Sequence, residues 1–368
     1  AWSLEATAAE LLSILNLPKR EPMPSFHLTV TQQKDKQYHL RAACSLNGET
    51  STTMDISSLQ TLIPHACKAL EETQVLPPSL EELPKMLHNL LLPPRIAVHL
   101  GVARERAQQR RQRRRWGLPL LLDLSAAEEL VEWPWELMCD EYNFLGMEPH
   151  VPLVRVLDAP HADGDRHLSR PLSLLIVSSE PKGLEGLNVK SEVTKLKKAL
   201  RWMGRYHYQY DWVQSGSWER VQAALIEKRP NAVHFIGHGS VNPVNGMGEL
   251  IFCDSDGYPD PISARELGLL FKDHGIELLF LNACSSAQVV GNQPGAAVAV
   301  SLLKQGIPNV LAMQYAIEDE AAVLLTETFY KELSFDKSFA EALARARMAL
   351  YAKWRDKLTW ATPVLYIS

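Results

Sequence analysis

Residues 232–240 read Ala-Val-His-Phe-Ile-Gly-His-Gly-Ser, and residues 278–286 read Leu-Leu-Phe-Leu-Asn-Ala-Cys-Ser-Ser. Each stretch is a run of apolar and β-branched residues, which is typical of a buried strand. Each run stops at a reactive side chain beside small residues, at His238-Gly239 in the first and at Cys284 in the second. We therefore predict neighbouring strands of a parallel sheet whose carboxyl ends place an imidazole beside a thiol.

The part of the chain after Pro171 repeats this pattern. Continuous apolar strands alternate with helical segments, an order that favours a mostly parallel sheet with helices on both faces. The strands are expected at residues 172–179, 206–213, 231–237, 277–283, 309–315 and 363–367. The predicted fold class is α/β, a three-layer α/β/α sandwich over residues 170–368.

Residues 1–160 form a smaller α/β region in this prediction. Its expected elements are a helix at 4–17, a strand hairpin at 25–31 and 37–46, a helix at 57–73, and strands at 95–101, 119–124 and 151–157. A stretch rich in Asp, Gly and His, residues 159–169, is expected to link the two regions.

The composition is that of a soluble globular protein. The chain has 368 residues, 46% hydrophobic and 22% charged, and its net charge of −5 gives no general attraction to nucleic acid. No apolar run approaches the roughly 18–20 residues that span a bilayer, and no signal peptide is visible. The five cysteines show no CxxC spacing, which favours a reducing, cytoplasmic setting over a disulfide framework. We expect no cofactor, no metal and no membrane partner.

His238 and Cys284 together suit nucleophilic catalysis. A thiolate is the attacking species, and a nearby imidazole takes the thiol proton and later gives it to the leaving amine. The N–H groups of Gly239 and Cys284 are the expected donors to the developing oxyanion. The predicted activity is that of a cysteine peptidase acting on a protein substrate.

Other interpretations of these residues are open. A lone Cys at a strand end is most often a small buried hydrophobe, and a lone His-Gly is equally common. A zinc site at His234, His238 and Cys284 is a further alternative, but the sequence supplies no good fourth ligand. His234 lies deep in an apolar run, so we expect it to be a structural residue near the site, as is Asn282.

A set of short segments stands out along the second part of the chain. They are Val233-His-Phe-Ile-Gly-His-Gly, Leu279-Phe-Leu-Asn-Ala-Cys-Ser, Gly306-Ile-Pro-Asn-Val-Leu-Ala-Met-Gln-Tyr, Phe329-Tyr-Lys-Glu-Leu, Ala344-Arg-Ala-Arg and Trp360-Ala-Thr-Pro-Val-Leu-Tyr, with Trp133-Pro-Trp-Glu-Leu and Pro152-Leu-Val-Arg upstream. Together they resemble the CHAT domain, a caspase-like, separase-related family. The specific part of the resemblance covers about residues 130–368.

The resemblance implies a caspase–hemoglobinase fold with His238 as the catalytic histidine and Cys284 as the nucleophile. It implies an endopeptidase that cleaves a protein partner under the control of another protein or an effector, in a bacterial defence pathway. Related structures pair an active caspase-like half with a degenerate one. Residues 1–160 are therefore expected to be a pseudo-protease or regulatory half.

The segment Gln314-Tyr-Ala-Ile-Glu-Asp-Glu-Ala-Ala resembles the separase segment that supplies an acidic residue to the S1 pocket. Asp319 is the matching position, and Glu318 and Glu320 flank it. An acid there favours a basic P1 side chain through a charge-assisted contact. The alternative is that Asp319 is the N-cap of a helix at residues 320–333.

Seven arginines lie between Arg104 and Arg115. The alternatives are a nucleic-acid-binding segment, a loop that an Arg-specific peptidase cuts in its own chain, and a solvated helix or loop. Only Trp116 adjoins the run, so the sequence offers no stacking platform for bases. Besides the peptidase, two functions stay open: a catalytically silent caspase-like scaffold and a nucleic-acid-binding regulator.

Overall fold

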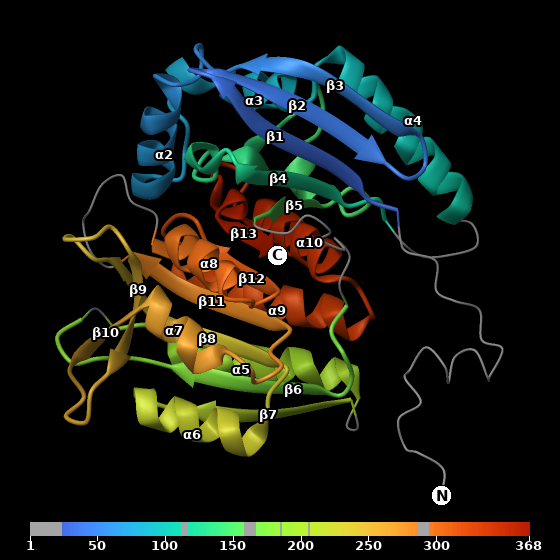
Figure 1. The fold of residues 1–368 in the computed structure, drawn as a ribbon. Helices are drawn as coiled ribbons and strands as arrows, with labels where there is room; N and C mark the ends of the chain where they lie inside the picture. The colour runs from blue at the N-terminus through green and yellow to red at the C-terminus, as the bar shows by residue number, and fades with distance from the viewer. Residues whose placement is uncertain (1–23, 112–116, 158–166, 185, 205–206, 286–293) are drawn as a thin grey trace, which may run out of the picture.

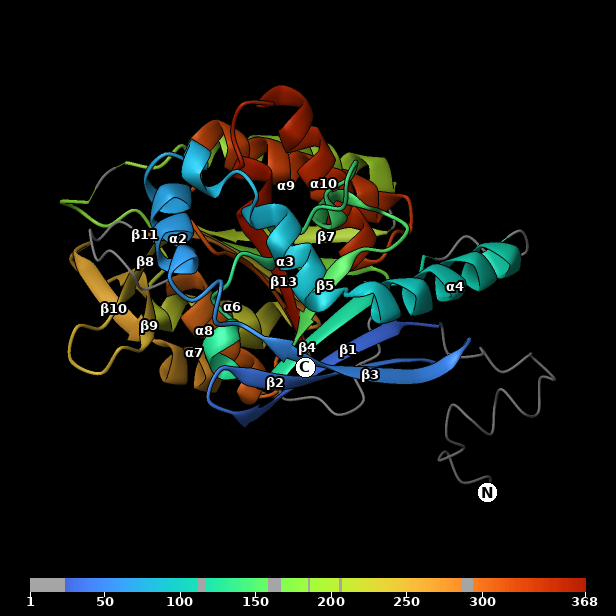
Figure 2. The ribbon, with the colours of Figure 1, turned by 90° about the horizontal axis from the view of Figure 1, so that it is seen from above.

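One large sheet runs through the molecule, with helices on both of its faces (Figures 1 and 2). The computed structural model describes residues 24–111, 117–157, 167–184, 186–204, 207–285 and 294–368. The apolar side chains of the strands and of the inward-facing helix stripes join in a core that continues across the sheet.

The main sheet follows one order from edge to edge. It runs through β7 (Tyr208–Val213), β6 (Leu172–Ser178), β8 (Ala232–Val241), β11 (Leu278–Ser285), β12 (Asn309–Met313), β13 (Pro363–Ile367), β5 (Leu153–Val156), β4 (Leu120–Ala126), β1 (Phe26–Lys34), β2 (Gln37–Cys44) and β3 (Gly48–Asp55). Strands β7 to β12 are parallel, as are β13, β5, β4 and β1. The predicted α/β fold with a mostly parallel sheet is confirmed.

A hairpin extends the sheet at the carboxyl end of β8. Strand β9 (Gly248–Cys253) pairs antiparallel with residues 238–241 of β8, and β10 (Pro259–Ser263) pairs with β9. Strand β6 pairs with residues 232–236 of β8. The C-terminal end of β8, which contains His238, therefore has β11 on one side and the hairpin on the other.

The helices divide between the two faces, as Figure 2 shows for α9 and α10 against α7 and α8. Helix α5 packs on α9, and α7 packs on α8. The helices are α2 (Leu62–Glu72), α3 (Leu83–Leu91), α4 (Pro94–Arg111), α5 (Val189–Leu200), α6 (Trp218–Lys228), α7 (Ala264–Phe271), α8 (Pro294–Lys304), α9 (Asp319–Ser334) and α10 (Phe339–Lys353). Short 3-10 turns include η2 (Glu128–Leu130), η3 (Trp135–Leu137), η4 (Leu145–Met147) and η6 (Thr359–Ala361). None of the described helices is long and apolar enough to cross a membrane.

The sequence pattern Ser-x-x-Glu at 263–266 and at 338–341 predicts a helix start at each serine, and α7 and α10 begin there. Ser263 and Glu266 form the full capping box at α7, where the Ser263 hydroxyl accepts from the Glu266 N–H and the Glu266 carboxylate accepts from the Ser263 N–H. At α10 the Ser338 hydroxyl accepts from the N–H of Glu341 at 3.2 Å.

The strand predicted at residues 95–101 is wrong, because this stretch is the first part of α4. Its apolar residues looked continuous in sequence, yet Ile96, Leu100 and Ala103 are buried while Val98 is 68% exposed. That spacing of four and three residues is the period of a helix, and the prolines before Arg95 suit a helix start. Strand β3 is not among the predicted strands, because its sequence is polar and shows little apolar alternation. The helix predicted at 4–17 and most of the predicted linker at 159–169 lie outside the described residues.

The sheet passes directly from the C-terminal part of the chain to the earlier part. Strand β13 pairs in parallel with β5, with Tyr366 opposite Arg155 and Ile367 opposite Val156. The predicted regions 1–160 and 170–368 thus share one sheet. Their division into two domains, with a degenerate caspase-like first half, stays a prediction.

A cluster of buried charges sits beside this junction. The Arg155 guanidinium binds both carboxylate oxygens of Glu136, with a distance of 3.1 Å from Nε to Oε1. Arg347 lies 3.6 Å from the same carboxylate, and all three side chains are 1% exposed or less. Burial lowers the pKa of Arg347 to about 10. Burial is also the largest single effect on Arg155, but its charge interactions with Glu136, Tyr366 and Tyr315 and its hydrogen bond to Glu136 together raise the pKa of Arg155. Glu136 therefore compensates two cations in the core.

The same cluster reaches into separate parts of the chain. Arg155 donates to Oε1 of Gln314, just after β12, at 2.8 Å, and Gln314 donates to the carbonyl of Glu132 at 2.7 Å. Arg347 donates to the carbonyls of Gly146 and Pro363. These bonds tie η3, η4, β5, α10 and the segment after β12 together.

We predict that Glu136→Ala lowers the free energy of unfolding by about 3–5 kcal/mol, because it leaves two buried guanidinium groups without their carboxylate. Denaturant unfolding measures this change. The matched control is Glu128→Ala, which removes an exposed pair with Lys304 and is expected to cost about 1 kcal/mol at most. Equal costs for the two variants would contradict the role given to the cluster.

Candidate functional site

Strands β8 and β11 lie side by side in parallel, as predicted from their sequences. Their register runs from Leu278 opposite Ala232 to Ser285 opposite Gly239, and it places Cys284 opposite His238. These are Cα positions; the side chain of Cys284 lies outside the described part of the chain. The two residues that the sequence singled out therefore occupy equivalent positions at the ends of adjacent strands.

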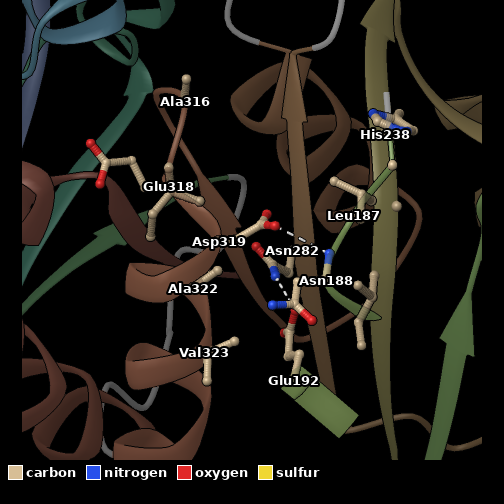
Figure 3. A pocket seen from close by; sticks show the side chains of 14 residues that line it. Leu187, Asn188, Glu192, His238, Asn282, Ala316, Glu318, Asp319, Ala322 and Val323 are labelled. Atoms are coloured by element: carbon tan, nitrogen blue, oxygen red, sulfur yellow. Dashed lines mark hydrogen bonds between the residues drawn. The ribbon is translucent and has the colours of Figure 1, made fainter. Parts of the chain in front are cut away.

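His238 lines a pocket of about 390 Å³ (Figure 3). The imidazole is 4% exposed and belongs to the wall formed by β8, together with Ile236 and Gly237. The opposite wall is formed by Ala316, Ile317 and the first turn of α9, and residues 186–188 before α5 complete the rim. The pocket thus lies directly beside the predicted histidine.

Asp319 faces this pocket from the start of α9 (Figure 3). Its Oδ2 accepts a hydrogen bond of 3.2 Å from the backbone N–H of Asn188 on the other side of the rim. The alternative prediction of Asp319 as the N-cap is wrong by one residue, since α9 begins at Asp319 and Glu318 is the N-cap. A carboxylate in the first helical turn suits the positive end of the helix dipole, while its oxygens stay within reach of the pocket.

The two glutamates beside Asp319 are paired with lysines. Glu318 lines the pocket and binds Lys357. Glu320 binds Lys353 at 3.1 Å and is not among the described residues that line the pocket. Asp319 and Glu318 therefore line the pocket, whereas the carboxylate of Glu320 pairs with Lys353 of α10. The role of these acids in an S1 pocket stays a prediction.

A buried polar network forms the floor of the pocket. The carboxylate of Glu192 on α5 accepts from Asn282 Nδ2 at 2.8 Å and from Thr326 Oγ1 at 2.9 Å, and lies 2.9 Å from His234 Nε2. The other ring nitrogen of His234 lies 3.1 Å from the hydroxyl of Tyr330. His234 is thus a fully buried residue with hydrogen-bond partners at both ring nitrogens, and Asn282 holds the carboxylate in place.

The protonated phenol of Tyr330 determines the direction of the hydrogen bonds in this network. Burial and the nearby Glu192 raise the pKa of Tyr330 well above its ordinary value, so the phenol keeps its proton. The phenol can then donate to His234 Nδ1, which leaves Nε2–H to donate to Glu192. In the described part of the chain, no group of three or more His, Cys, Asp or Glu side chains could hold a metal ion.

Glu192 was not among the predicted site residues. A sequence signal for it exists, because Glu192 lies three residues after Val189 and four before Leu196, on the apolar face of the predicted helix. A carboxylate on a core-facing stripe needs several hydrogen-bond donors, and at this position they come from β8, β11 and α9.

The family of the chain follows from its motifs and from a family-model match. The CHAT domain model matches residues 81–367, which is more than half of the chain. The chain belongs to the CHAT domain family. A comparison with curated proteins found no match. The match begins well before residue 130, where the specific motifs begin.

CHAT domains are a caspase-like, protease-related family, and several CHAT motifs of this chain meet in the buried charge cluster. Trp133-Pro-Trp-Glu-Leu supplies Glu136, Pro152-Leu-Val-Arg supplies Arg155, and the segment ending in Met-Gln-Tyr supplies Gln314. Ala344-Arg-Ala-Arg supplies Arg347. These motifs hold the fold, whereas the two strand-end motifs contribute His238 and Asn282 to the lining of the pocket.

Gly239 occupies an interior position of the sheet. It lies opposite Leu250 of β9 on one side and Ser285 of β11 on the other. The role of its N–H and that of Cys284 as oxyanion donors stays a prediction.

The arginine run begins in the CHAT-matched helix α4. Arg104 lies 3.7 Å from Glu148, and Arg106 donates to the carbonyl of Leu46, so these two contact the fold itself. Residues 112–116 lie outside the described residues. Nucleic-acid binding by this run stays a prediction.

We predict that Thr326→Val lowers the free energy of unfolding by about 1.5–3 kcal/mol, because it removes a buried hydrogen bond to the charged Glu192 without changing the side-chain shape. Thermal or denaturant unfolding measures the change. The exposed Thr194→Val on α5, whose hydroxyl donates to the carbonyl of Lys190, is the control and should change stability by about 0.5 kcal/mol or less. A Thr326 variant as stable as the control would show that the network is not a stabilising one.

Proposed function

We propose that this chain is a cysteine endopeptidase with a His238–Cys284 dyad. The observation that carries the proposal is the register of β8 and β11, which pairs Cys284 with His238, a residue that lines the pocket. Asn282, two residues before Cys284 on β11, lines that pocket as well. Membership of a caspase-like, protease-related family supports the same reaction class.

The proposed reaction has two steps. His238 accepts the proton of the Cys284 thiol, and the thiolate attacks the carbonyl carbon of the scissile peptide bond. As the C–N bond breaks, the imidazolium gives its proton to the leaving amine and a thioester remains. In the second step His238 takes a proton from water, the resulting hydroxide attacks the thioester, and the thiol regains its proton as the acid product leaves.

The charge of the pocket supports a basic P1 residue. Glu192, Glu318 and Asp319 line it, and none of its described lining residues is Lys or Arg. Lys357 already binds Glu318, and the Glu192 carboxylate already has three hydrogen-bond partners. Asp319, whose carboxylate accepts a hydrogen bond from the backbone N–H of Asn188, is therefore the carboxylate proposed to bind the P1 cation.

A protein substrate and control by another protein or an effector belong to the same proposal. They rest on the resemblance to caspase-like peptidases, as does a role in bacterial defence.

We predict that Cys284→Ala and His238→Ala each reduce cleavage by at least about 10³-fold, since each removes one half of the dyad. A peptide-library cleavage profile identifies the substrate sequence, and rates with that peptide measure the loss. Cys139→Ala, at a half-buried cysteine far from β8 in the sequence, is the control and should leave the rate unchanged. Cleavage by either dyad variant at the wild-type rate, with the fold intact by circular dichroism, would refute the proposal.

We predict that Asp319→Asn lowers kcat/KM for peptides with Lys or Arg at P1 by about 10- to 100-fold, because the amide keeps the shape but loses the charge. Peptides with a neutral P1 residue should change little. Glu320→Gln removes the neighbouring charge that Lys353 already pairs, and it is the matched control. A basic preference that survives in Asp319→Asn would rule out this carboxylate as the specificity residue.

A further inference from the structure

One wall of the pocket is a short irregular segment. Residues Gln314 to Glu318 connect β12 to α9, and Ala316, Ile317 and Glu318 line the pocket. Figure 3 shows Ala316 and Glu318 on the side opposite His238. Backbone groups in such a segment lack the partners that a helix or a strand supplies, so side chains or water have to satisfy them. The position of the wall depends on what binds these groups.

Helix α2, from the N-terminal region, supplies the partners. The Glu71 carboxylate accepts from the N–H of Ala316 at 3.0 Å, and Gln74 Nε2 donates to the carbonyl of Ala316. Both backbone groups of this pocket-lining residue are therefore held by side chains that lie 245 and 242 residues away in the sequence and three residues from each other. Cys67, four residues before Glu71, accepts from the Tyr315 hydroxyl at 3.6 Å. Cys67 and Glu71 are four residues apart on α2, and Gln74 directly follows its C-cap Thr73, so one face of α2 and the residue after its end contact the wall.

Gln74 also joins the wall to the end of the chain. Its Oε1 accepts from the Thr359 hydroxyl, and its backbone carbonyl accepts from the N–H of Leu358 at 2.7 Å. The residue is 7% exposed and has a positive φ of 56°, a conformation that costs energy in a non-glycine residue unless its contacts repay it. Gln74 thus forms hydrogen bonds with Thr359 and Leu358 while its side-chain amide binds Ala316.

We propose that Glu71 and Gln74 are positioning residues that set the substrate-binding wall at Ala316, and that the N-terminal region controls the pocket through them. The link to catalysis rests on the peptidase function proposed above. Helix α2 and Gln74 lie before residue 81, where the CHAT match begins, so this control belongs to the N-terminal region of this chain. A partner that displaces α2 would move the wall and weaken substrate binding.

The test compares variants of the full chain in two measurements. Glu71→Ala removes the acceptor for Ala316 N–H, and Gln74→Glu places a carboxylate against the Ala316 carbonyl at nearly unchanged size. Each should raise KM of the preferred peptide about tenfold with kcat within about twofold, because the wall contributes binding rather than chemistry. Each should also speed amide hydrogen exchange at Ala316 about tenfold.

Two further variants act as controls. Glu71→Gln keeps an oxygen that accepts from Ala316 N–H and should restore most of the affinity and protection. Glu72→Ala removes the adjacent exposed carboxylate, whose partner is Lys68, and should leave KM and exchange unchanged.

Each outcome decides the proposal. Unchanged exchange at Ala316 in both Glu71→Ala and Gln74→Glu would overturn the contact itself, and faster exchange with unchanged KM would overturn its positioning role. If the wild type cleaves no peptide and Cys284 resists a peptide-based thiol reagent, the peptidase function fails, while exchange at Ala316 still tests the hold of α2 on the wall.

Discussion

The Glu136 carboxylate lies in the core between the guanidinium groups of Arg155 and Arg347, and the packing of the elements around it depends on this buried charge cluster. Arg155 comes from β5, Arg347 from α10, and Gln314 from the segment after β12. Buried charges are stable only when they are fully paired, so these elements have to come together as a set. Gln314 is also the first residue of the segment that lines the pocket from Ala316 onward, so the same cluster anchors the start of this segment.

The position of the pocket is set by the parallel pairing of β8 and β11. Because β8 and β11 run side by side in register, their carboxyl ends bring His238 and Cys284 together although 46 residues separate them in sequence. The helices above this edge carry the carboxylates, Glu192 from α5 and Asp319 from α9. An acidic pocket next to an imidazole is thus a product of the strand–helix alternation that the sequence displays.

Much of this could be predicted, because the signals are local. The runs at 232–240 and 278–286 and the capping serines at 263 and 338 gave the correct strands and helix starts. The prediction of secondary structure was wrong where the pattern of buried positions, and not the apolar composition, distinguishes a helix from a strand. Residues 95–101 are apolar enough for a strand, but only the alternation of buried Ile96 and Leu100 with exposed Val98 reveals a helix. The apolar helix face marks Glu192 as buried, but the partners of Glu192, Glu71 and Gln74 lie far away in the sequence, where no local pattern displays them.

The central claim is that Cys284 is a nucleophile activated by His238 beside an acidic pocket. A peptide-based electrophile with a basic P1 residue, followed by mass spectrometry of the labelled peptide, tests it most directly. The account predicts that the label sits on Cys284 and that His238→Ala largely prevents labelling. A label found only on other cysteines, such as Cys67 or Cys139, or labelling of Cys284 that is equally fast without His238, would contradict it.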